Sequence, residues 1–153
     1  MILNQTSVYA LRAMAALAGL GPGETLRAAD LAERTGVPVH YLSKIMSKMV
    51  EHRLVVGRKG HGGGFALCRP AREIRVADVL EASDFHVEPG TCAFGWGDCD
   101  PRAPCPLHTS WSRLQEFVLH WADETTLEDT RTGSLPGAAD PETPVSRRRG
   151  RRG

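Results

Sequence analysis

The chain has 153 residues, a hydrophobic fraction of 41% and a formal net charge of +1. This length suits one domain with appendages, and the sequence has no apolar run long enough to span a membrane. Residues 1–5 lack the basic region that opens a signal peptide. We therefore expect a cytoplasmic protein that does not bind a membrane.

Charge is unevenly distributed along the chain. Residues 1–75 carry eleven Lys/Arg and five Asp/Glu, so this part is basic. Residues 76–130 carry two Lys/Arg and eleven Asp/Glu and are acidic, whereas residues 131–153 carry six Lys/Arg and two Asp/Glu and are basic again. A basic N-terminal part is typical of a surface that binds a polyanion. Scattered solvated charges would give the same totals, so this pattern supports DNA binding only if the segment also has a DNA-reading architecture.

Apolar residues recur at steps of three and four in the N-terminal part, which predicts helices over residues 6–20, 27–34 and 40–53. Thr6 can cap the first helix, and Pro38 suits the first position of the third, where its missing N–H costs nothing. The third helix is amphipathic, and its expected buried stripe is Leu42, Ile45, Met46 and Met49.

The hydrophobic period then changes from that of a helix to that of strands. Residues 54–56 and 65–68 are predicted strands, and the basic, glycine-rich residues 58–64 between them predict a β-hairpin. A further short helix is expected over 75–83. This order is that of a winged helix-turn-helix, so the predicted fold is mainly α with a small β-hairpin wing, and residues 1–83 form its DNA-binding domain.

A helix that reads the major groove must bury one face and present a polar face to the bases. The third predicted helix meets both demands, and the glycine-rich wing can bring its cations to phosphates or to a minor groove. Three-helix units with a hairpin also serve as protein–protein modules, so this alternative stays open. The candidate DNA-binding residues are His40, Tyr41, Ser43, Lys44, Arg58, Lys59 and His61.

The remaining residues divide into three segments. Residues 84–105 are an aperiodic, Gly/Pro/Cys-rich loop, residues 106–130 contain a helix expected over 106–125, and residues 131–153 form an Arg-rich tail with the composition of a disordered segment. The apolar stripe of residues 106–130 is too long for one small domain to cover. That stripe is Leu107, Trp111, Leu114, Phe117, Val118 and Trp121.

Three cysteines and a histidine predict a metal site in the loop. Cys92, Cys99, Cys105 and His108 are separated by six, five and two residues, with Cys105 and His108 expected one turn apart on the last helix. Three thiolates and an imidazole suit an iron–sulfur cluster or a tetrahedral zinc, and the long gaps favour a cluster. Reduced structural thiols and a regulatory disulfide are the alternatives. Cys68, in the predicted hairpin, is interpreted as a core residue.

The residues also resemble a known family, the BadM-type (Rrf-two) winged-helix regulators, over about residues 1–130. No single motif carries the resemblance, but together the motifs are specific. They are Tyr9-Ala10-Leu11-Arg12-Ala13-Met14, Val39-His40-Tyr41-Leu42-Ser43-Lys44-Ile45, Gly60-His61-Gly62-Gly63-Gly64-Phe65-Ala66-Leu67 and Cys105-Pro106-Leu107-His108.

The resemblance implies a homodimeric transcriptional regulator, with residues 106–130 as its dimerisation helix, that reads a roughly palindromic DNA operator. We expect a repressor. We do not expect an enzyme, because the sequence has no Cys-X-X-Cys motif, phosphate-binding loop or nucleophile with an evident base.

The resemblance also implies that a cluster senses redox, nitric oxide or iron status. Cys92, Cys99 and Cys105 match the family's thiolate ligands, and His108 matches the fourth ligand of the IscR-like branch, which carries a 2Fe–2S rather than a 4Fe–4S cluster. The nitric-oxide branch uses an aspartate in the first helix, where this chain has Val8.

Two departures from the IscR-like pattern affect what can be carried over. The first gap between cysteines has six residues instead of five, so the loop geometry can differ. Ser43 stands where that pattern has a glutamate that sets DNA preference, so no operator sequence carries over. The alternative function is a winged-helix regulator that senses a small molecule or a protein partner, with zinc or only thiols at the cysteine site.

Overall fold

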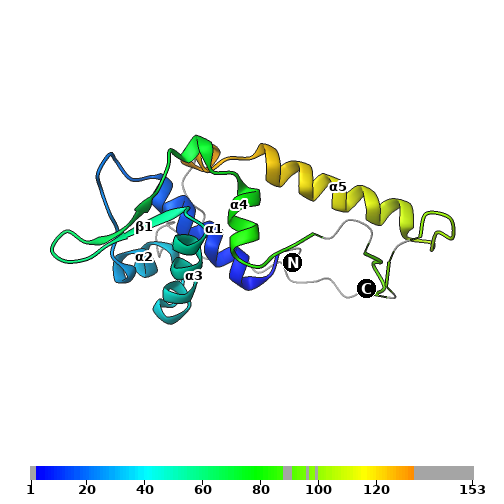
Figure 1. Ribbon diagram of the computed structural model, residues 1–153, viewed down its shortest axis with the longest axis horizontal. Helices are drawn as coiled ribbons and strands as arrows, with labels where there is room; N and C mark the ends of the chain where they lie inside the picture. The colour runs from blue at the N-terminus through cyan, green and yellow to red at the C-terminus, as the bar shows by residue number, and fades with distance from the viewer. Residues whose placement is uncertain (1–2, 88–90, 96, 99, 133–153) are drawn as a thin grey trace, which may run out of the picture.

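The computed structural model describes residues 3–87, 91–95, 97–98 and 100–132. Figure 1 shows the first four helices and the hairpin gathered into one body, from which the last long helix extends. None of the helices in these ranges is long and apolar enough to cross a membrane. The elements in chain order are α1 (Gln5–Ala18), α2 (Ala28–Thr35), α3 (Val39–Glu51), β1 (Val55–Arg58), β2 (Gly64–Leu67), η1 (Ala71–Glu73), α4 (Val76–Ala82), α5 (His108–Glu124) and η2 (Leu127–Thr132).

Helix α1 lies at the centre of the body, where it contacts α2, α3, α4, β2 and η2. Its C-terminal half is buried, and most of the buried residues there are alanines, which let neighbouring helices approach closely. The helix begins after Asn4, whose side chain accepts a hydrogen bond from the Ser7 amide at 2.8 Å. The prediction that Thr6 caps this helix is therefore wrong, because Asn4 occupies the capping position.

The turn between α2 and α3 has the form expected of a helix-turn-helix. Helix α2 ends at Gly36, which has a φ of 66° in the left-handed region that glycine adopts without strain. Pro38 caps α3 rather than forming its first residue. The predicted buried stripe of α3 is confirmed, since it packs into the core through Leu42, Ile45, Met46 and Met49.

Strands β1 and β2 form the antiparallel hairpin of the wing, with Val55 opposite Leu67 and Arg58 opposite Gly64. Two reciprocal backbone hydrogen bonds, of 3.0 and 2.7 Å, also join Phe65 to Leu26 in the segment before α2. The winged helix-turn-helix predicted from the sequence is therefore present. The hairpin ends before Cys68, which is exposed, so the prediction that Cys68 belongs to the core is wrong.

Helix α5 is attached to the body at its C-terminal end. The Val76 amide donates to the Thr125 carbonyl at 2.8 Å, and the Leu127 amide donates to the Ile74 carbonyl at 2.9 Å. Leu127 itself is fully buried in the core beside α1. From this attachment α5 runs outward, so that its N-terminal end lies far from the body (Figure 1).

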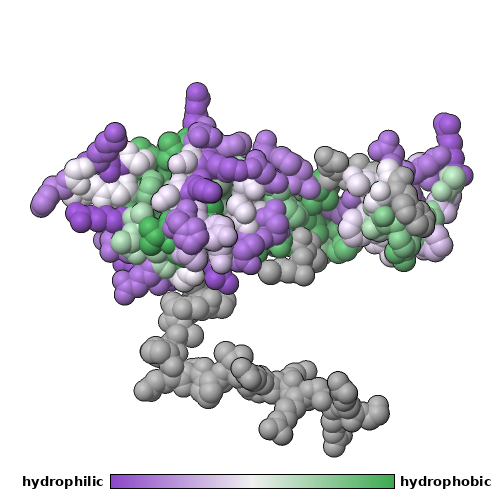
Figure 2. Space-filling view, turned by 90° about the horizontal axis from the view of Figure 1, so that it is seen from below, coloured by the Kyte–Doolittle hydropathy of each residue, from purple (hydrophilic) through white to green (hydrophobic). Residues whose placement is uncertain are grey.

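The apolar stripe of α5 is divided between two environments. Val118 is buried, and Trp111 is half-buried. The others face solvent in this single chain. Figure 2 shows hydrophobic surface where α5 leaves the body and again near its far end. The exposed members are Leu107, Leu114, Phe117 and Trp121.

Replacing Gly64 by alanine should destabilise the fold. A Cβ at Gly64 would lie 2.6 Å from the Leu26 backbone, and its φ of 149° disfavours any side chain. Overpacking and backbone strain predict a loss of about 1–3 kcal/mol in the free energy of unfolding, measured by urea denaturation. The control is Gly57→Ala, whose Cβ would meet only the Phe65 ring at an ordinary 3.6 Å. Equal stability of the two variants would contradict this account of the wing.

Candidate functional site

The four candidate residues on α3 lie together on its exposed side. Tyr41 is 47% exposed, and its ring contacts Tyr9 of α1 edge-on, with 5.8 Å between ring centroids. The ring of His40 lies 4.4 Å from that of Tyr41. The contact between Tyr41 and Tyr9 thus holds the start of α3 against α1, while part of the Tyr41 ring stays accessible to a ligand. Ser43 and Lys44 are exposed on the same helix.

The three candidate residues on the wing, Arg58, Lys59 and His61, are also exposed. The loop that carries them is ordered by its own backbone and by the body. The Gly63 amide donates to the Gly60 carbonyl at 3.0 Å, and the Thr25 hydroxyl donates to the Gly62 carbonyl at 3.0 Å. The glycine-rich loop is expected to bring the wing close to DNA. Its glycines also allow the backbone of the wing to pack against the chain itself, since a Cβ at Gly63 would lie 2.5 Å from the Arg58 carbonyl oxygen.

One ion pair beside α3 was not anticipated from the sequence. Lys48 binds the carboxylate of Asp84, the second residue after α4. Hydrogen bonding to Lys48, and then its charge, hold the pKa of Asp84 below its usual value. The pair is invisible to local sequence patterns because its members are 36 residues apart.

The cysteine loop contains a small turn around Cys92. The Cys92 amide donates to the Gly97 carbonyl at 3.1 Å, and the Gly95 amide donates to the Cys92 carbonyl at 2.9 Å. The preceding residue, Thr91, accepts a 2.7 Å hydrogen bond from Nε1 of Trp111 on α5. Cys92 is thereby held beside the first turns of α5, whereas Cys99 lies outside the described residues.

Cys105 and His108 are neighbours at the start of α5. The His108 amide donates to the Cys105 carbonyl at 3.0 Å, and both side chains are half-buried. The sequence placed both residues on the helix, but α5 begins only at His108. Cys105 instead lies in the turn before it, because Pro104 and Pro106 flank it and proline disfavours a helical conformation in the residue before it.

Cys92, Cys105 and His108 all lie near the outer end of α5, but among the described residues no three His, Cys, Asp or Glu side chains are close enough together to hold a metal ion. Soft sulfur ligands and imidazole are the donors that iron–sulfur clusters and zinc prefer. Figure 1 shows that this end of α5 is remote from α1–α3 of the same chain. The two groups of candidate residues are thus not one site: the first lies on the body and the second at the far end of α5.

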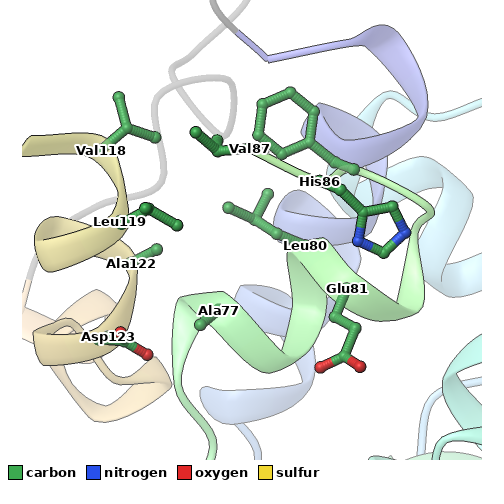
Figure 3. A pocket seen from close by; sticks show the side chains of 10 residues that line it. Ala77, Leu80, Glu81, His86, Val87, Val118, Leu119, Ala122 and Asp123 are labelled. Atoms are coloured by element: carbon green, nitrogen blue, oxygen red, sulfur yellow. The ribbon is translucent and has the colours of Figure 1, made fainter. Parts of the chain in front are cut away.

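A cavity of about 190 Å³ that opens to the surface lies between α4 and α5, beside the buried contact of Ala122 with Val76 and Leu80. Figure 3 shows that Leu80 of α4 faces Leu119 and Ala122 of α5 across it, with Val87 of the segment after α4 at its edge. Packing between α4 and α5 is therefore incomplete next to the segment that leads into the cysteine loop.

Comparisons with known proteins agree with this architecture. A family model described as Rrf2, iron-dependent transcriptional regulator, matches residues 3–131. A helix-turn-helix-type transcriptional regulator of Mycobacterium tuberculosis is 34% identical over 137 residues, which cover 89% of this chain and 84% of that protein. The helix-turn-helix-type regulator IscR of Vibrio parahaemolyticus is 32% identical over 132 residues, which cover 86% of this chain and 78% of that protein.

Two solved structures share the fold. CymR, the global cysteine regulator of B. subtilis, superposes with a TM-score of 0.72 at 22% identity over 84% of this chain and 95% of that one. IscR of T. potens does so with a TM-score of 0.65 at 21% identity over 83% of each chain. The relatives are named as transcriptional regulators rather than enzymes. This chain belongs to the Rrf2 family of DNA-binding transcriptional regulators, in its IscR-like branch.

Proposed function

We propose that this protein regulates transcription through an iron–sulfur cluster held by Cys92, Cys99, Cys105 and His108, and that the state of the cluster modulates DNA binding. The observation that supports this most is the hydrogen bond between Trp111 Nε1 and the Thr91 carbonyl. It brings the backbone next to Cys92 to the helix that begins at His108, although 15 residues lie between the two ligands in the sequence.

The residues fit such a group chemically. The thiols supply soft, anionic ligands, and the imidazole of His108 supplies a neutral one, as in the IscR-like pattern that favours 2Fe–2S over 4Fe–4S. The side chains of Cys92, Cys105 and His108 are half-buried, so oxidants and nitric oxide can reach them. When bound, the group would supply redox- and oxidant-sensitive chemistry at the far end of α5.

The chain's own contacts suggest how a change at this end is communicated. In the sequence, residues 88–107 join Val87 to the start of α5. Phe85, His86 and Val87 line the cavity against the base of that helix. A change in how the cysteine loop is held would therefore alter both the loop and the packing of α4 against α5. The recognition helices of a dimer would then change their relative positions, and with them the affinity for an operator. We propose repression as the outcome.

A homodimer explains the exposed stripe of α5. Phe117 is 68% exposed, and Leu114 and Trp121 flank it one turn away on the same side. A second copy that pairs with this stripe would bury it and would place two recognition helices on one duplex. A dimer with two-fold symmetry reads a palindromic site, so we propose that the operator is roughly palindromic.

The first experiment tests the cluster. Protein purified without oxygen should show visible absorption bands with matched iron and sulfide, two of each per chain for a 2Fe–2S group. Cys92→Ala should lose the bands because a thiolate ligand is removed, whereas Cys68→Ala, at an exposed cysteine outside the loop, should keep them. A colourless protein that contains zinc, or no metal after reconstitution with iron and sulfide, would instead favour the zinc or thiol-only sensor.

The second experiment tests the dimer. Truncating an aromatic side chain at the centre of an interface costs about 2 kcal/mol, so Phe117→Ala should weaken dimerisation about thirtyfold. Sedimentation over a concentration series measures this change. The matched control is Glu116→Ala, which alters the adjacent exposed residue without removing apolar area. If Phe117→Ala and the control dimerise equally well, the stripe is not the interface.

The third experiment tests α3 as the reading helix. Lys44→Gln should weaken binding to a short duplex and lower the salt dependence of log K by about 0.9, the value for one lost phosphate contact. Fluorescence anisotropy at several salt concentrations gives both quantities. Arg113→Gln removes the same charge from an exposed position on α5 and should leave the salt dependence unchanged. If Lys44→Gln leaves the dependence of log K on log salt unchanged, Lys44 does not contact a phosphate.

A further inference from the structure

Helix α3 carries two lysines one turn apart, and they are in different situations. Lys44 is exposed, whereas Lys48 is bound to Asp84. Residues four apart lie on the same side of a helix, so both ammonium groups belong to the surface that we assign to DNA. The ion pair thus withholds one of two positive charges that α3 can present.

Asp84 is held in place by the end of α4. It has a φ of 57°, its amide donates to the Glu81 carbonyl at 3.0 Å, and the Phe85 amide donates to the Leu80 carbonyl at 3.0 Å. The hydroxyl of the preceding Ser83 is buried and forms a 2.8 Å hydrogen bond with that of Ser7 on α1. The backbone of Asp84 is therefore fixed to the core, so its carboxylate has little freedom to move. The longer and more flexible side chain of Lys48 reaches to it.

The pair is electrostatically favourable but easily exchanged. Lys48 keeps the pKa of Asp84 low, and His86 and His52 contribute weaker effects in the same direction, so the carboxylate is charged at neutral pH. The side chains are 39% and 68% exposed. Ion pairs at such positions contribute little net stability, so a DNA phosphate can compete with Asp84 for the ammonium group.

Asp84 also begins the segment that leads to the cysteine loop. The next residues, Phe85 to Val87, line the cavity between α4 and α5 (Figure 3). A rearrangement of α5 at this cavity would therefore act on the residues immediately after Asp84. Asp84 directly precedes this segment and also contacts α3 through Lys48. It is therefore placed to link the two, because coupling requires an element that both sites bias.

We propose that Lys48 is a further phosphate-binding residue of the reading helix, and that Asp84 is a positioning residue that holds Lys48 back from DNA. The inference rests on the proposed role of α3 in DNA reading. Linkage makes the competition reciprocal: DNA bound to Lys48 weakens its attachment to Asp84, and a displaced Asp84 strengthens DNA binding.

The test is Asp84→Asn, measured with the full-length protein and a short duplex of arbitrary sequence at several salt concentrations. Asparagine tolerates the left-handed backbone conformation of this position, so the fold should be kept. Release of Lys48 to a phosphate should steepen the dependence of log K on log salt by about 0.9, which is roughly an eightfold gain in affinity for each tenfold drop in salt. An unchanged slope and affinity would overturn the proposal.

Two controls separate this effect from a general change of charge. Glu81→Gln removes the same charge from an exposed position on α4, three residues away, and should not steepen the slope. Combining Asp84→Asn with Lys48→Gln should abolish the gain, since the gain acts through Lys48. If the combined variant keeps the gain, or if Glu81→Gln reproduces it, Asp84 does not act by holding Lys48.

Lys44→Gln, measured in parallel, distinguishes this failure from that of the proposed function. If Lys44→Gln weakens binding while the Asp84 and Lys48 variants show no coupling, α3 still contacts DNA and only the gating pair is refuted. If neither lysine affects binding, α3 is not the surface that contacts DNA, and both proposals fall.

Discussion

The arrangement of this protein depends on the close packing of α1 against its neighbours. The helix touches α2, α3, α4, β2 and η2, which is possible because most side chains along its buried half are no larger than alanine. Packing at close range leaves little freedom for a neighbour to shift alone. The positions of α3, of the wing strand β2 and of η2, which follows α5, are therefore set by contact with the same central helix.

The two groups of candidate residues, those proposed to bind DNA and those proposed to bind a metal, lie in different parts of the molecule. The polar side of α3 and the cations of the wing lie on the body, whereas Cys92, Cys105 and His108 lie near the far end of α5 (Figure 1). The attachment of α5 through Thr125 and Leu127 gives the helix a fixed base and a distant end. The two groups of candidate residues therefore do not meet within one chain.

Much of the candidate site could be predicted from the sequence, because it depends on residue type and local spacing. Helical periodicity identified the buried side of α3, and therefore which of its residues remain exposed. The clustered cysteines singled out the loop whatever its conformation. The errors concern features that local patterns describe poorly: a cap moved from Thr6 to Asn4, a turn rather than a helix at Cys105, and exposure of Cys68 because the hairpin ends one residue earlier.

The winged helix-turn-helix, the ligand-type side chains and the amphipathic character of α5 can all be read from the sequence, since each follows from the order and period of residues within a short segment. Which distant residues meet depends instead on how the helices pack. Trp111 with Thr91, Lys48 with Asp84 and Ser7 with Ser83 are pairs separated by 20, 36 and 76 residues. Such pairs arise when packed helices bring remote segments together, and no local period records that.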